Sequence, residues 1–318
     1  MDMTRRSFLR DGAMSVCGLF AASSLPAFAD APKWFPKRGR FERLSLACRH
    51  VAAGASKPFS ILHISDTHLT SAGNDDSEWA RKQSACRTKT FGGCQEEALR
   101  DSLAWAKEHV DYVIHTGDLI DFQSKANFEL VKKYYGANAG FLIGSLGNHE
   151  YYRGQPGEDE KDSFKAKSLA NIKEAFPFDV SVQSTVLNGV NFVALDNVYG
   201  TITEAQMGRL EAEFKKGLPV ILFMHCPINT PNILRASKKF WSSANPKAVP
   251  DMRGFKPVKP DKNADHKKYA AYLKAQPLLK AILAGHIHVT VEDRFSPSAM
   301  EYVVGGNFLF HGQEITIA

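Results

Sequence analysis

Five short groups of polar residues along the chain consist of side chains that bind metal ions or transfer protons. In chain order they are Asp66-Thr67-His68, Gly117-Asp118-Leu119-Ile120-Asp121, Gly147-Asn148-His149-Glu150, His225, and Gly285-His286-Ile287-His288. Mixed carboxylate, amide and imidazole ligands favour manganese, iron or zinc over calcium or magnesium. The residue types therefore predict a transition-metal site, with enough ligands for two ions.

Each group comes directly after a short apolar segment. These segments are residues 59–64, 112–115, 141–146, 220–224 and 281–283. Apolar segments of this length predict buried strands, and the strand ends of an open α/β sheet present their side chains along one rim. We therefore expect the five groups to converge. A single histidine at a strand end is more often a hydrogen-bonded polar residue than a ligand, and we interpret His63, His115 and His311 in that way.

The spacing within the groups suggests how two ions could be shared. Asp66 and His68 are two residues apart, so they face the same side of a strand end and can bind one cation together. Asp118 has two carboxylate oxygens and can lie between two ions that are about 3.5–4 Å apart. Asn148 supplies an amide oxygen, and the remaining ligands are imidazole nitrogens of His225, His286 and His288.

The five groups resemble the calcineurin-like metallophosphoesterase family in type and order. That family has Asp-x-His, Gly-Asp-x-x-Asp, Gly-Asn-His-Asp/Glu, a lone His and Gly-His-x-His, and the resemblance covers residues 60–290. It implies an α/β fold with a two-sheet β-sandwich flanked by helices. It also implies one ion on Asp66, His68 and His288, a second on Asn148, His225 and His286, and Asp118 as the bridge.

The resemblance implies hydrolysis of phosphate esters by a hydroxide that bridges the two ions, with a phosphodiesterase favoured over a phosphomonoesterase. His149 is then a catalytic residue that stabilises the transition state and protonates the leaving oxygen. Purple acid phosphatases carry a tyrosine ligand in the second group, where this chain has Ile120-Asp121, and Asp-x-Gly in place of Asp66-x-His68, so that subgroup is disfavoured. Asp121 and Glu150 are interpreted as residues that orient the ligands, with solvation at the surface as the open alternative.

A basic segment, residues 229–277, lies between two of the ligand groups. It holds eleven Lys and Arg against three Asp, in a chain whose net charge is +6. We predict a cap-like insertion, which either selects the substrate or only keeps the protein soluble. Two other functions stay open, namely an inactive binding or scaffold protein of the same fold and an exported polyanion-binding protein. No defined nucleic-acid-binding module is present in the sequence.

The N-terminus resembles a twin-arginine export signal. Arg5-Arg6 precedes a weakly apolar stretch at residues 13–25, which is too short to span a bilayer, and then Ala27-Phe28-Ala29. We predict cleavage of residues 1–29 after transport by the twin-arginine export machinery, and a periplasmic or secreted protein without a membrane span. Residues 30–58 are predicted to form a linker with an edge strand near residues 41–48, and residues 59–318 to form one domain.

Apolar periodicity and turn residues predict the remaining elements. Helices are expected at residues 94–109, 128–135, 165–176 and 203–216, the last with Thr203 and Gln206 as a capping box. A hairpin should turn at Asn188-Gly189, residues 74–92 should form a loop, and residues 289–317 should add antiparallel strands. Cys86 and Cys94 are predicted to form a disulfide, with two thiols as the alternative, and Cys226 to be a small buried residue.

Overall fold

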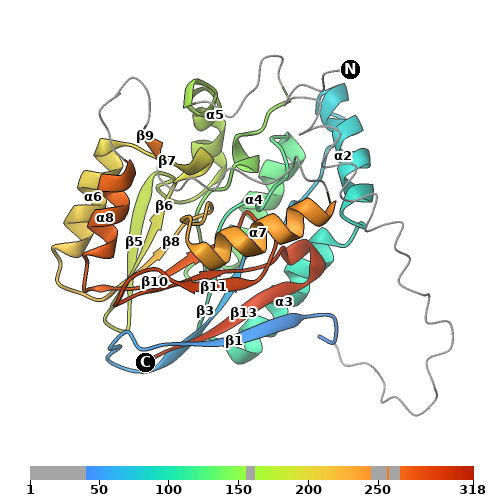
Figure 1. Cartoon of the computed structure of the whole chain (residues 1–318). Helices are drawn as coiled ribbons and strands as arrows, with labels where there is room; N and C mark the ends of the chain where they lie inside the picture. Colours follow the sequence, from blue (N-terminus) through green and yellow to red (C-terminus); the bar gives the residue numbers. More distant parts are fainter. Residues whose placement is uncertain (1–40, 155–161, 245–255, 258–265) are drawn as a thin grey trace, which may run out of the picture.

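Two β-sheets face each other and carry helices on their outer sides (Figure 1). The computed structural model describes residues 41–154, 162–244, 256–257 and 266–318, so the predicted signal at residues 1–29 lies outside the described residues. The first sheet has the order β1-β13-β2-β3-β4, with bounds Ser45–Val51, His311–Ile317, Phe59–Ile64, Tyr112–His115 and Leu142–Gly144. The second has the order β11-β12-β10-β8-β6-β5, with bounds Val291–Arg294, Met300–Val303, Leu279–Ala284, Val220–Phe223, Val190–Leu195 and Val182–Leu187. This arrangement confirms the predicted fold class.

The central strands β6 and β8 are apolar except for Asn191, because both of their faces are covered. Every residue of β6 and β8 is buried, as expected for parallel strands that lie between two layers. Between the sheets pack side chains such as Ile61, Phe192 and Ile221. Helices α3 (Gln95–His109) and α4 (Lys125–Ala137) cover the outer face of the first sheet, and α6 (Glu204–Phe214) and α8 (His266–Lys274) that of the second.

Several local predictions are confirmed. Helices α3, α4, α5 (Asp162–Ala175) and α6 lie where the periodicity places them, and α6 begins with the predicted capping box. The hairpin of β5 and β6 turns through Asn188 and Gly189, both with positive φ. The predicted edge strand is β1, which pairs with β13 at the margin of the first sheet.

The prediction of a loop at residues 74–92 is wrong, because helix α2 spans Glu78–Thr90. Only Ala80 and Arg87 are buried within it, so its sequence lacks the apolar stripe by which a helix is usually recognised. Its start is defined by Ser77, whose side chain accepts a hydrogen bond from the backbone N–H of Ala80 at 3.1 Å.

The C-terminal strands are only partly antiparallel. β11 runs antiparallel to β12 and β13 runs antiparallel to β2, but β12 pairs in parallel with β10 and β13 pairs in parallel with β1. The expectation for residues 289–317 therefore holds for two of the four strand pairs.

The described parts of the basic segment form three separate elements, α7, β9 and α8. Helix α7 (Pro231–Ala244) lies beside β11, and the short strand β9 (Lys256–Pro257) pairs with β7 (Thr201–Ile202). In α8, Leu273 is fully buried in the core beneath the second sheet. Phe255 lies outside the described residues.

Two further findings concern cysteines and membranes. No disulfide joins any of the four cysteines in the described ranges, so the predicted pair of Cys86 and Cys94 is not formed, and Cys226 is buried as expected. Across the same ranges, every helix is too short or too polar to cross a bilayer.

Candidate metal centre

The five groups of the sequence meet at one edge of the sandwich. Asp66 and His68 follow β2, Asp118 follows β3, and Asn148 follows β4, all in the first sheet. The second sheet contributes His225 after β8 and His286 and His288 after β10. The two sheets are joined there by a hydrogen bond from the backbone N–H of His286 to Asp66 Oδ2, at 2.9 Å.

Three ligand atoms form the first ligand set, which consists of Asp66, His68 and His288. His68 Nε2 lies 3.2 Å from His288 Nε2, and Asp66 Oδ1 lies 3.3 Å from His288 Nε2 and 3.8 Å from His68 Nε2. Ligands bound tetrahedrally at about 2.1 Å from one ion would be separated by about 3.4 Å. The separations of the first set thus fit a shared cation.

A second ligand set consists of Asn148, His225 and His286. Asn148 Oδ1 is 3.1 Å from His225 Nε2 and 3.1 Å from His286 Nδ1, and the two nitrogens are 3.2 Å apart. These separations also fit one cation, with one amide oxygen and two imidazole nitrogens as its ligands.

Asp118 lies between the two sets. Its Oδ2 is 3.1 Å from His225 Nε2 in the second set and 3.8 Å from His68 Nε2 in the first. Its Oδ1 accepts a hydrogen bond from the backbone N–H of His149 at 2.8 Å. One oxygen of Asp118 is therefore fixed by the backbone, and the other is placed where a bridging ligand is needed.

The electrostatics of the centre also favour bound cations. Asp66 and Asp118 are almost completely buried, and burial alone would raise the pKa of each carboxyl. Nearby imidazoles outweigh burial and lower the pKa of both carboxyls. At His225, burial would lower the pKa, but the carboxylate of Asp118 outweighs burial and raises this pKa to about 10. Asp66 Oδ1 makes no hydrogen bond with any described residue. Buried anions of this kind require positive charge beside them, so the residues fit two metal ions.

The backbone of the ligand groups is strained. Among the described residues, eight non-glycine residues have positive φ, and five of them are in these groups, namely Asp66, His68, Asp118, His286 and His288, with φ between 52° and 71°. Such conformations cost on the order of 1 kcal/mol or more each and tend to occur at functional sites. Gly117, with φ of 94°, is required because a side chain there would collide with the backbone of Gly147.

Asp121 and Glu150 are fully buried, so the surface alternative for them is wrong. Asp121 Oδ1 lies 3.0 Å from His68 Nδ1, which orients that ring. Glu150 accepts hydrogen bonds from the backbone N–H groups of Asp118, Ile120 and Gly147 at 2.6–3.1 Å. It thereby holds the second and third groups together.

Arg87 is a residue of the centre that the sequence did not reveal. Its Nε and Nη2 donate to the two carboxylate oxygens of Asp121, each at 2.7 Å, and its guanidinium lies 4.6 Å from the centre of the Phe91 ring. Burial would raise the pKa of Asp121, but Arg87 and His149 hold it well below its usual range. The position of α2 beside the first group is what brings Arg87 to Asp121. The sequence analysis predicts a loop in place of this helix, so it does not identify Arg87.

The C-terminal turn η3 (Asn307–Leu309) supports the first group. The backbone N–H of Asn307 donates to the Ser65 carbonyl at 2.8 Å. The side chain of Asn307 accepts from the Thr67 hydroxyl at 3.1 Å, and Thr67 is 2.9 Å from His115 Nε2. His115 Nδ1 accepts from the Gly117 N–H at 3.2 Å, so Nε2 carries the proton and donates to Thr67. His115 is a satisfied polar residue, as predicted.

Aromatic rings surround the first ligand set. Phe91 stacks on His68 with ring centres 4.7 Å apart, and Phe308 lies 5.3 Å from the ring of His288. From α7, Trp241 lies 5.5 Å from His288 and donates its indole N–H to the Ile287 carbonyl at 3.1 Å. These contacts limit the positions that the two imidazoles can take.

His149 lies beside the first ligand set, with its ring centre 4.6 Å from that of His68, and is not one of the six residues of the two sets. Its Nδ1 donates to the backbone carbonyl of Asp121 at 2.8 Å, and its side chain is 25% exposed. Burial disfavours a charge on this ring, but Asp118 and Asp121 outweigh burial and raise its pKa to about 9. The two carboxylates thus favour the protonated form of this ring, which lies on the partly exposed side of the centre.

A family model supports the convergence of these groups. The model described as calcineurin-like phosphoesterase matches residues 59–290. The chain belongs to the calcineurin-like phosphoesterase family. Members of that family typically depend on two metal ions, and the buried Asp and His groups of this calcineurin-like phosphoesterase could bind them.

Solved structures resemble this calcineurin-like phosphoesterase in fold. A dimetal phosphatase from Danio rerio is 16% identical, with a TM-score of 0.45, and the match covers 80% of this chain and 91% of that one. A phosphopantetheinyl hydrolase from Mycobacterium tuberculosis is 14% identical, with a TM-score of 0.37 and coverage of 79% and 91%. A putative 5′-nucleotidase from Staphylococcus aureus is 12% identical, with a TM-score of 0.38 and coverage of 79% and 49%, so the match spans about half of that protein. No curated protein matches the chain.

Proposed function

We propose that the chain is a dinuclear phosphoesterase, which hydrolyses phosphate diesters in preference to monoesters. The observation that carries this proposal is the position of Asp118 Oδ2, 3.1 Å and 3.8 Å from the nearest nitrogens of the two ligand sets. A carboxylate between two sets of ligands is what a pair of neighbouring cations requires.

The residues have distinct roles in this proposal. Asp66, His68 and His288 hold one ion, Asn148, His225 and His286 hold the other, and Asp118 bridges. When bound, the ions, of manganese, iron or zinc, would supply an activated water and polarise the phosphoryl oxygens. His149 donates a hydrogen bond to the substrate and a proton to the leaving oxygen, a role supported by its raised pKa and its exposed edge.

The charge around the centre supports the preference for diesters. At neutral pH a phosphate monoester carries almost one more negative charge than a diester does. The guanidinium of Arg87 is a positive charge close to the centre, but two of its N–H groups already donate to the carboxylate of Asp121. Those two N–H groups of Arg87 are therefore not available to the second charge of a monoester.

Metal analysis together with two model esters tests the proposal. The purified protein should contain about two transition-metal ions per chain and should hydrolyse bis(4-nitrophenyl) phosphate faster than 4-nitrophenyl phosphate. Asn148→Ala and His225→Ala should each lose one ion and most activity. His50→Ala, which removes an exposed histidine of β1, is the matched control and should change neither. A fully metal-loaded protein that is inert towards both esters contradicts the proposal.

We also propose that the protein is exported through the twin-arginine machinery to the periplasm or beyond. The support is the Arg5-Arg6 pair and the Ala27-Phe28-Ala29 segment. Replacement of both arginines by lysine should retain the uncleaved chain in the cytoplasm, as measured by cell fractionation and mass spectrometry of the N-terminus. Cleavage and export of that variant at the normal level would contradict this assignment.

A further inference from the structure

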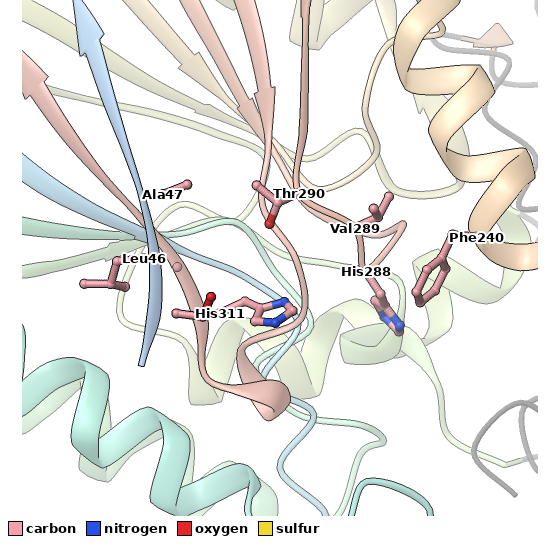
Figure 2. A pocket seen from close by; sticks show the side chains of 9 residues that line it. Leu46, Ala47, Phe240, His288, Val289, Thr290 and His311 are labelled. Carbon is pink, nitrogen blue, oxygen red and sulfur yellow. The ribbon is translucent and has the colours of Figure 1, made fainter. Parts of the chain in front are cut away.

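A cavity of about 340 Å³ opens beside the metal ligand His288. Figure 2 shows His288 and Phe240 at one end of the cavity and Leu46 and Ala47 at the other, with His311 between them. Its walls come from the starts of β1 and β13, from α7, and from the residues that follow β10. The cavity is therefore continuous with the first ligand set and extends away from it along the edge of the first sheet.

The lining of this cavity combines apolar residues with a few uncharged polar ones. None of its nine residues, all within the described ranges, is Lys, Arg, Asp or Glu, and Leu46, Ala47, Phe240 and Val289 are apolar. A phosphate or carboxylate group would find no cation there beyond the metal centre itself. In size, the cavity exceeds the roughly 150 Å³ that is known to hold benzene, and it lies in the range of about 300–1,000 Å³ of small-molecule sites.

Thr290, which is exposed, can supply a polar contact for a neutral ligand, whereas His311 Nδ1 is closed off from solvent. His311 Nδ1 is buried and has no hydrogen-bond partner among the described residues, so the prediction that His311 is satisfied is wrong for this atom. Burial lowers the pKa of His311, which keeps the ring neutral. Thr290 Oγ1 accepts from the Gly305 N–H at 3.0 Å, and the hydroxyl can still donate its proton.

We propose that this cavity binds the uncharged organic group of the phosphate ester, of the size of a bicyclic aromatic ring, while the phosphate lies at the His288 end. The inference rests on the proposed function, because it assigns the phosphate to the metal centre. The apolar walls would cover the ring, and the Thr290 hydroxyl would bind a hydroxyl, amino or carbonyl group on it.

A second cavity of about 380 Å³ provides a contrast. It is lined by Arg43, Phe91, Gly92, Cys94, Phe308, Leu309 and Phe310, and contains no residue of the five ligand groups. Arg43 is already paired with Glu97 at 2.8 Å. Leu309 in this cavity is therefore a suitable control position, since it is 42% exposed and apolar but does not adjoin a metal ligand.

Hydrolysis of two esters that differ in the organic group tests the assignment. Ala47→Trp, which fills the cavity, and Phe240→Ala, which removes one wall, should each raise KM for 1-naphthyl phosphate by about tenfold or more. Neither variant should change KM for glycerol 2-phosphate, and Leu309→Ala should change neither value. Equal KM values for 1-naphthyl phosphate in the wild type and in both cavity variants would overturn the proposal.

A binding measurement separates this proposal from the proposed function. Saturation-transfer NMR with 2-naphthol should show binding to the wild type and to Leu309→Ala, and reduced binding to Ala47→Trp and Phe240→Ala. If that pattern appears in a protein that hydrolyses no ester, the cavity assignment stands and the proposed function fails. If both cavity variants bind 2-naphthol as the wild type does, the cavity assignment fails, whatever the hydrolytic activity.

Discussion

The two ligand sets of the centre are held in different ways. His68 in the first set is oriented by the side chain of Asp121 and stacked on Phe91, and Asp121 is in turn bound by Arg87. In the second set, His225 Nδ1 donates to the backbone carbonyl of Thr116 at 2.8 Å, and its ring meets only that of His286 among the described aromatic pairs. The first set thus depends on side chains such as those of Arg87, Phe91 and Phe308, whereas the second depends on a backbone carbonyl just after β3.

This difference indicates which ligand set is more sensitive to substitutions of the surrounding side chains. A contact to a backbone carbonyl persists through any substitution that keeps the strand in place, but a contact to a side chain can be removed by one mutation. We therefore expect single substitutions outside the ligands to affect the first set much more than the second.

The largest effect is expected at Asp118, which belongs to both sets. Asp118→Asn should lower kcat/KM by about 10³-fold or more, because a neutral amide cannot compensate two adjacent cations. Metal analysis should show loss of ions from both sets. Asp75→Asn, an exposed carboxylate near α2, is the control. Retention of two ions in Asp118→Asn would mean that the sets are independent of the bridge.

His149→Asn should come next in magnitude. We expect both ions to remain and kcat to fall by about 10²-fold or more, because the substitution removes a proton donor but no ligand. Metal content and kcat should be measured on the same sample. Loss of an ion would instead place His149 among the ligands and break the division into two sets.

Arg87→Ala tests the comparison most directly. Removal of a residue that orients a ligand typically weakens metal affinity by about 10–100-fold, and here only the ion of the first set should be affected. Titration with a chelator should show one ion released early and the other unchanged. Arg87→Lys should restore little, because lysine cannot bind both oxygens of Asp121. Lys82→Ala, at an exposed position of α2, should behave as the wild type.

These expectations also show what a sequence can and cannot predict here. The ligands follow apolar strands, so the sequence predicts their convergence, and Thr203 and Gln206 identify the start of α6 by local capping. Arg87 could not be predicted, because its role depends on a mostly exposed helix that meets Asp121 from 34 residues away. The orphaned nitrogen of His311 likewise results from packing between strands far apart in sequence.

The smallest effect on activity is expected at Glu301, below the second ligand set. Glu301 is fully buried and accepts from the Ile228 N–H at 2.6 Å, and burial raises its pKa to about 8. Because its pKa in the folded state exceeds that in the unfolded state, the folded protein binds the proton more tightly. The free energy of unfolding should therefore fall as pH rises from about 4.5 to 8, by on the order of 4 kcal/mol.

Glu301→Gln should remove that pH dependence and leave kcat nearly unchanged. Urea unfolding at several pH values measures it, with Glu174→Gln on the exposed side of α5 as the control. An unaltered pH profile in Glu301→Gln would show that another group causes the dependence. A large loss of activity would show that the second ligand set also depends on a side chain, because Glu301 binds the loop after His225.

The docking of η3 onto the first group has a consequence for the order of events during biosynthesis. Thr67 and Asn307, joined by a hydrogen bond, are separated by 240 positions. While the ribosome is still making the last strands, the loop that carries Asp66 and His68 lacks its outer support and two of the imidazoles have only just been synthesised. Under the proposed function, ion binding would therefore follow the synthesis of the last strands, and metal content would report whether η3 has docked on the first group.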